Sequence, residues 1–193
     1  MGLIANQMAL ELFFKIRNRV KEKEKLNKKI RQYIGILAAL AAYYIVHEGA
    51  HLLYALLTGV FAGVHFLGLG IQIDVFNEKM TDIQMFLFCL VGAGSTFVMG
   101  YLLTALRKVI CRVKSKMFRA AMYYITISML LLDPLYLSIL CGFFGGGDMN
   151  GIALLIPEGF ARIFYGILFL TNGGVFWKMV LPIYKQSFQK DEK

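Results

Sequence analysis

His47, Glu48 and His51 form an H-E-x-x-H pattern inside an apolar segment that runs from about residue 33 to residue 59. On a helix, residues four apart lie one turn apart on the same face, so the two imidazoles can bind one metal ion. Glu48 then points to where a metal-bound water would lie. Imidazole and carboxylate groups are usual ligands of zinc. The pattern therefore predicts a hydrolytic site with one Zn²⁺ per chain, and its apolar flanks put that site at bilayer depth.

A catalytic zinc usually has three protein ligands and an open position, so this pattern needs one more ligand. Two acids lie in apolar surroundings, where such residues are costly and rarely idle. Depth favours Asp133, because Asp133 and His47 each lie 14 residues, about 21 Å on a helix, from the start of their apolar segments. Local chemistry favours Asp148, because the glycines before it let the backbone fold back toward a metal. Asn150, nearby, is a candidate substrate-positioning residue.

Composition predicts an all-α polytopic membrane protein, since 58% of the 193 residues are hydrophobic and the mean hydropathy is +0.61. Four segments have the roughly 20 apolar residues that a span needs. They are residues 33–58, 84–106, 119–143 and 159–184.

The charge pattern predicts the orientation of these spans. Nineteen of the 21 basic residues lie in residues 15–31, 107–119 and 178–193. Cytosolic loops of membrane proteins are rich in Lys and Arg, so both termini and the 107–119 loop are expected in the cytosol, most simply at the cell membrane. This pattern explains the net charge of +9 without a nucleic-acid partner.

The chain divides into a cytosolic amphipathic and basic N-terminal helix, residues 1–32, and a membrane domain, residues 33–193. We expect no secretory signal at its start, because the first apolar stretch is short and contains Glu11. Residues 60–76 are interrupted by glycines and partly alternating, which indicates a short β-hairpin associated with the membrane, not a span. Gly70 and Gln72 of this hairpin are further candidates for positioning substrate.

Other features have plain interpretations. His65 is expected on the polar face of a strand, not at a metal. The small residues of Gly92-Ala93-Gly94-Ser95 favour close helix packing. The three cysteines are separated in the sequence and are expected to be free thiols.

These motifs together resemble the site-2 protease family of intramembrane zinc metalloproteases, over roughly residues 33–155. H-E-G-A-H in an apolar helix, the Gly-rich β segment after it and the small-residue motif in the next span all have counterparts in that family. The resemblance implies that His47 and His51 are zinc ligands and that Glu48 is the general base. It also implies a late Asp ligand, for which Gly147-Asp148 is the closer match, with Asp133 as the rival.

The expected function is cleavage of peptide bonds in a transmembrane protein or peptide, with the hairpin holding the unwound substrate as an added strand. A homo-oligomer or a regulatory membrane partner is compatible with the sequence. The alternative is a catalytically inactive relative that acts as a scaffold or chaperone for a membrane partner. Haem binding is disfavoured, because two histidines one turn apart cannot take opposite axial positions. A metal transporter is disfavoured, because the other spans have few acids and histidines.

Overall fold

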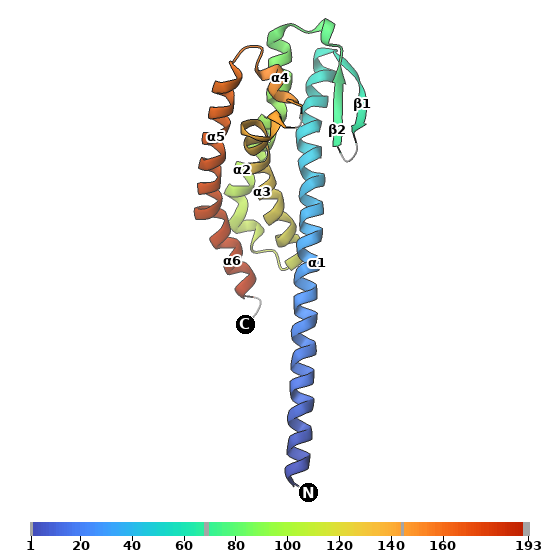
Figure 1. Ribbon diagram of the computed structural model, residues 1–193, viewed down its shortest axis with the longest axis vertical. Helices are drawn as coiled ribbons and strands as arrows, with labels where there is room; N and C mark the ends of the chain where they lie inside the picture. Colours follow the sequence, from blue (N-terminus) through green and yellow to red (C-terminus); the bar gives the residue numbers. More distant parts are fainter. Residues whose placement is uncertain (1, 68–69, 144, 191–193) are drawn as a thin grey trace.

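The computed structural model describes residues 2–67, 70–143 and 145–190. Its longest element is α1 (Gly2–Thr58), which joins the basic N-terminal segment and the first apolar segment in one unbroken helix (Figure 1). The expected boundary near residue 32 therefore lies inside a helix. The amphipathic character expected for residues 1–32 rests in part on side chains outside the described part of the chain, which before residue 17 includes only that of Lys15.

The hairpin predicted for residues 60–76 is confirmed. Strands β1 (Phe61–Leu67) and β2 (Gly70–Val75) pair antiparallel, with Val64 opposite Ile73. The hairpin folds back along the upper part of α1 (Figure 1), and Ile73 is buried against the bundle. The strand that follows the turn is thus held next to the helix that carries the histidines.

Helix α2 (Asp82–Ile110) follows a short 3₁₀ turn, η1 (Asn77–Lys79). It begins with a capping box, in which the Thr81 hydroxyl accepts a hydrogen bond from the backbone of Gln84 and the Gln84 side chain accepts one from the backbone of Thr81. Helix α3 (Lys116–Ser138) begins in the same way, because the Ser115 hydroxyl accepts from the backbone of Phe118. These caps fix where the second and third long helices start.

The third apolar segment ends earlier than predicted, at Ser138 and not near residue 143. A short 3₁₀ turn, η2 (Leu140–Gly142), and a glycine run follow it, and glycine is a poor helix former. Gly145, Gly146 and Gly147 have positive φ angles of 91°, 84° and 47°. Only glycine adopts these angles readily, so the run turns the chain back toward the bundle and into the one-turn helix α4 (Asp148–Ile152).

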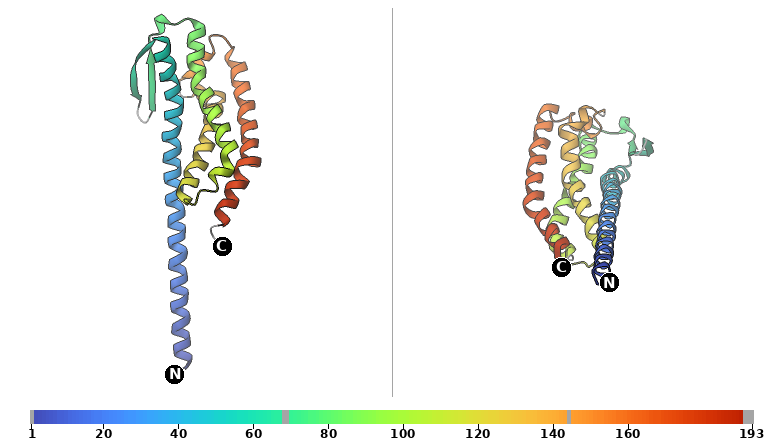
Figure 2. Two further views of the ribbon diagram at one scale, coloured as in Figure 1. Left: turned by 180° about the vertical axis from the view of Figure 1, so that it is seen from behind. Right: turned by 60° about the horizontal axis from the view of Figure 1, so that its bottom comes forward.

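The last apolar segment is a continuous arc of α5 (Glu158–Val175), a π-helical turn η3 (Phe176–Val180) and α6 (Leu181–Gln189). Of the described helical segments, four are long and apolar enough to cross a membrane: 17–58, 82–110, 116–138 and 158–189. Figure 2 shows them side by side, with the polar part of α1 extending beyond the bundle.

Two clusters of buried side chains hold these helices together. One lies toward the hairpin end and joins α1, β2, α2, α3, α4 and α5; the other lies toward the opposite end of the bundle, where α6 ends. Asn172 links α5 to α2 and α3. Its side chain accepts a hydrogen bond from the hydroxyl of Tyr101 in α2 and donates one to the carbonyl of Leu130 in α3, each at 2.8 Å. Between these two clusters, buried polar side chains of α1, α2 and α3 lie between the helices, among them His47, Thr96 and Asp133.

Candidate metal centre

His47 and His51 lie one turn apart on the inner face of α1, as their spacing predicts. Their exposed fractions are 8% and 3%, and their Nε2 atoms are 3.2 Å apart. The His47 ring stacks on Tyr43, and the His51 ring packs against Phe88 of α2. These ring contacts fix both imidazoles so that one nitrogen of each faces the same point.

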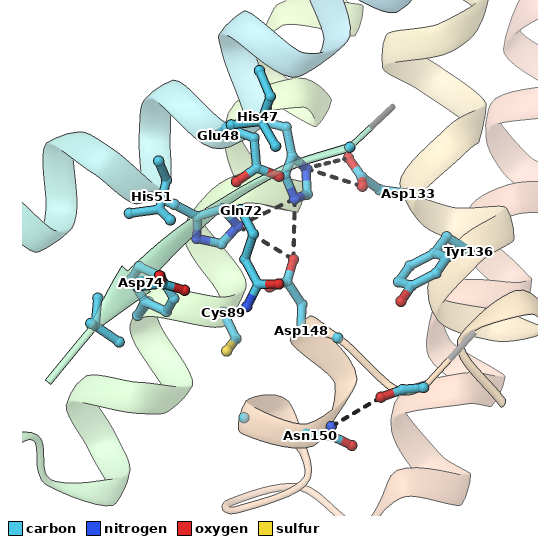
Figure 3. Close-up of a pocket in the computed structure, with 18 of the residues that line it drawn as sticks. His47, Glu48, His51, Gln72, Asp74, Cys89, Asp133, Tyr136, Asp148 and Asn150 are labelled. Carbon is cyan, nitrogen blue, oxygen red and sulfur yellow. Dashed lines mark hydrogen bonds and ion pairs between the residues drawn. The ribbon is translucent and has the colours of Figure 1, made fainter. Parts of the chain in front are cut away.

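Asp148 reaches this point from a segment a hundred residues later in the chain (Figure 3). Its Oδ2 atom lies 3.2 Å from Nε2 of His47 and 3.4 Å from Nε2 of His51. Burial raises the pKa of the Asp148 carboxyl, but hydrogen bonds from the two histidines outweigh burial and hold the pKa at about 2. The Asp148 carboxyl group is therefore anionic at neutral pH.

The three atoms fit a small tetrahedral ion. Bonds of about 2.0–2.1 Å at tetrahedral angles put neighbouring ligand atoms about 3.3–3.4 Å apart. The separations of 3.2, 3.2 and 3.4 Å match three edges of that figure. His47, His51 and Asp148 thus form a group that can hold a metal ion.

Asp133, the rival third ligand, lies on the other side of the His47 ring. Its carboxylate is 3.2 Å from Nδ1 of His47, the nitrogen that faces away from Asp148, and it is 2% exposed. Asp133 also accepts hydrogen bonds from the hydroxyls of Tyr43 and Thr96. A carboxylate here fixes the His47 tautomer and ring orientation and leaves Nε2 free for a metal.

Sequence reasoning missed Tyr43 and Thr96 as parts of this centre. Tyr43 lies four residues before His47 and so shares its face of α1. Thr96 belongs to α2, and its contact with Asp133 joins residues 37 apart in the sequence. The spacing of Tyr43 from His47 could have indicated its place, whereas the contact of Thr96 depends on how α2 and α3 pack.

Gly92 has a role beyond the helix packing that its motif suggested. A methyl group at Gly92 would lie 2.8 Å from Nε2 of His47 and closer still to Nε2 of His51. Gly94, two residues on, points to another side of α2, where an added methyl group would meet nothing within 4 Å. Gly92 therefore leaves the room that the two imidazoles occupy, while the Ser95 hydroxyl ties α2 to the Val46 carbonyl of α1 at 3.1 Å.

A cleft of about 1080 Å³ opens beside His47, His51 and Asp148. Glu48 lines it half-buried, with the backbone of Ile73 in β2 within hydrogen-bonding range of its carboxylate. The candidate positioning residues are brought together here, because Gly70, Gln72 and Asn150 all line the cleft. Figure 3 shows Gln72 and Asp148 on the same side of the histidines.

The remaining sequence candidates have structural partners. His65 lies on β1, as expected, and forms an ion pair with Asp74 across the hairpin. The cysteines are free thiols, as expected, and Cys89 and Cys141 are buried. Cys89 lines the cleft next to the metal group.

No protein-family model, curated protein or solved structure matches this chain. The class of this protein is therefore described from its fold and its group of buried polar side chains. It is a mainly helical chain with four described helices suited to a membrane, a two-stranded sheet and a His-His-Asp group in a cleft.

Proposed function

We propose that the protein is an intramembrane zinc metalloprotease, similar to the site-2 protease family, that cleaves membrane-protein substrates. The observation that carries this proposal is the convergence of His47, His51 and Asp148 at tetrahedral spacing beside Glu48. Two nitrogens and one oxygen with an open fourth direction are the ligand set of a catalytic zinc. The cleft gives that open direction access to a peptide.

The surface of the bundle supports a place in the membrane. Large apolar side chains face outward from three of the long helices, among them Ile45 at 72%, Val98 at 69% and Leu170 at 74% exposed. Such a belt is unfavourable in water and favourable against lipid. The basic clusters favour a cytosolic location for both termini.

The depth of the site follows from the length of α1. His47 lies 11 residues before the helix ends at Thr58, which corresponds to about 16 Å. His47 lies 16 residues, about 24 Å, after Arg31, the last residue of the basic cluster in α1. The hairpin borders the cleft beside His47. We infer that water and substrate enter from the hairpin side, opposite the cytosol.

The reaction is hydrolysis of a peptide bond. Zinc, when bound, polarises the peptide carbonyl and makes a water molecule more acidic. Glu48 takes a proton from the attacking water as the oxygen adds to the carbonyl carbon, and it gives a proton to the amine nitrogen as the C–N bond breaks. Asp133 holds His47 in the tautomer that the site needs.

A helical substrate must first unwind, because its carbonyls are otherwise hydrogen-bonded within the helix. All six residues of β2 line the cleft, whereas β1 contributes only His65 among its described side chains. One edge of β2 pairs with β1, and in this two-stranded sheet its other edge has no strand partner among the described residues. An unwound segment can add to that edge as a third strand, with its scissile carbonyl near Glu48.

The test is proteolysis by the full chain in nanodiscs. Matched transmembrane peptides, one with a central Gly-Pro break and one with Leu-Ala at the same place, are incubated with wild type and with Glu48→Gln. We expect cleavage of the broken peptide by wild type alone. If both proteins leave all peptides intact although zinc is bound, the inactive scaffold becomes the better account; cleavage by both would indicate a contaminating protease.

A further inference from the structure

A second groove lies at the opposite end of the bundle, where α1, α3 and α6 meet. Its volume is about 390 Å³, and it is separate from the metal cleft, with which it shares no lining residue. Figure 2 (right) brings forward this end of the bundle, where α6 ends near the C-terminus. Its lining residues are Lys28, Arg31, Gln32, Lys116, Ala120, Tyr123, Tyr124, Leu181, Tyr184, Lys185, Phe188 and Gln189.

The groove gathers positive charge from all three helices. Lys28 and Arg31 come from α1, Lys116 from the first turn of α3 and Lys185 from α6, and none of the described lining residues is acidic. Like charges brought together repel one another, most strongly where water is partly excluded. An anion between them offsets that repulsion, so the charge pattern favours a negatively charged ligand.

The inner wall of the groove is apolar and aromatic. The Tyr123 ring packs against Tyr184 with centroids 5.2 Å apart, and both side chains are largely covered. Ala120 and Tyr124 press against Gly35 of α1, where an added methyl group would lie 3.2 Å from the Ala120 carbonyl. Lys116 is the first residue of α3 and lies one helical turn, about 6 Å along the helix axis, before Ala120. On α3 the groove thus changes from cationic to apolar along the helix, from Lys116 to Tyr123 and Tyr124.

This gradient is the chemistry of a phospholipid and not of a soluble anion. A phosphodiester headgroup matches the Lys and Arg rim, while an acyl chain matches the aromatic wall that leads toward the apolar part of the bundle. Free phosphate would use only the rim. The rim also lies at the basic ends of the spans, the level at which headgroups of the cytosolic leaflet are expected.

We propose that this groove binds one anionic phospholipid and that the lipid bridges α1, α3 and α6. This inference rests on the membrane placement argued above, and it is independent of catalysis. The bridge would fix the angle of the basic part of α1 to the bundle, because Lys28 and Arg31 reach the rim from that helix.

Native mass spectrometry of the detergent-purified full chain tests the proposal. Palmitoyl-oleoyl phosphatidylglycerol and the matching phosphatidylcholine are titrated against wild type and Lys28→Gln/Lys185→Gln, whose two side chains are exposed and tolerate replacement. At about 1 kcal/mol per basic residue, the double variant should bind phosphatidylglycerol roughly thirtyfold more weakly. Wild type should bind one phosphatidylglycerol in preference to phosphatidylcholine.

The matched control is Arg112→Gln/Lys114→Gln, which removes two exposed charges from the α2–α3 connection, outside the groove. It should keep the wild-type affinity. An equal loss in this control would mean that only the overall charge matters and would overturn the proposal. Equal binding of phosphatidylcholine, or displacement of the lipid by inorganic phosphate, would overturn it as well.

Discussion

Replacing Asp133 with asparagine tests how the centre holds His47. The side chain keeps its shape but loses its charge, and one of its two acceptor oxygens becomes an NH₂ group. Three donors converge on the carboxylate: the hydroxyls of Tyr43 and Thr96 and Nδ1 of His47. An amide offers one acceptor, so the hydroxyls must rotate and His47 competes for the oxygen that remains.

The size of the effect follows from the role of Asp133. Loss of a carboxylate that hydrogen-bonds a ligating histidine typically weakens metal binding about 10–100-fold, which corresponds to about 1.4–2.8 kcal/mol. We expect Asp133→Asn to fall in this range and still to take up one zinc per chain, because His47, His51 and Asp148 all remain. Asp148→Asn removes an anionic ligand and should lose more.

The assay is competition between the purified chain and a fluorescent zinc chelator in detergent. Thr126→Val is the matched control, since Thr126 is a buried polar residue of the same helix that bonds the carbonyl of Met122, away from the centre. It should bind zinc as wild type does. The reasoning is refuted if folded Asp133→Asn keeps wild-type affinity, or if Asp133→Asn loses zinc entirely while Asp148→Asn keeps it.

Three further predictions concern the same centre. Glu48→Gln should retain zinc but lower peptide cleavage by roughly 10²–10⁴-fold, the usual range for a general acid–base; zinc analysis and cleavage of one sample separate the two effects. Gly92→Ala should displace the imidazole of His47 and weaken zinc binding at least about tenfold, whereas Gly94→Ala, which meets open space, should stay within about twofold; equal behaviour of the two variants in chelator competition would contradict the close approach at Gly92. Removal of zinc by 1,10-phenanthroline should abolish cleavage, and added zinc should restore it; activity that survives complete removal would argue against a metal-dependent reaction.

The lengths of the apolar segments and the positions of the glycines predicted much of the fold. The apolar segments predicted all four long helices because their lengths match a span, and glycine interruptions with partial alternation predicted the hairpin at residues 60–76. The end of α3 was placed too late, because apolar composition continues past Ser138 although the glycines after it do not favour a helix.

The centre could be predicted only in part. His47, Glu48 and His51 belong to one helix, so their geometry follows from local spacing. The choice between Asp148 and Asp133 depends on how far the chain turns back at Gly145–Gly147. Counting residues along a helix, as the depth argument did, cannot predict such a turn. Both acids lie next to His47, one at each ring nitrogen, so the depth argument found a real neighbour of the histidine.

The zinc content of the detergent-purified chain, measured by inductively coupled plasma mass spectrometry, tests the central claim most directly. The site described here predicts one zinc per chain in wild type and in Glu48→Gln, and a loss of zinc in Asp148→Ala. A wild-type chain that takes up no zinc when zinc is supplied, or an Asp148→Ala chain that holds zinc as tightly as wild type, would contradict the claim that His47, His51 and Asp148 form a zinc site.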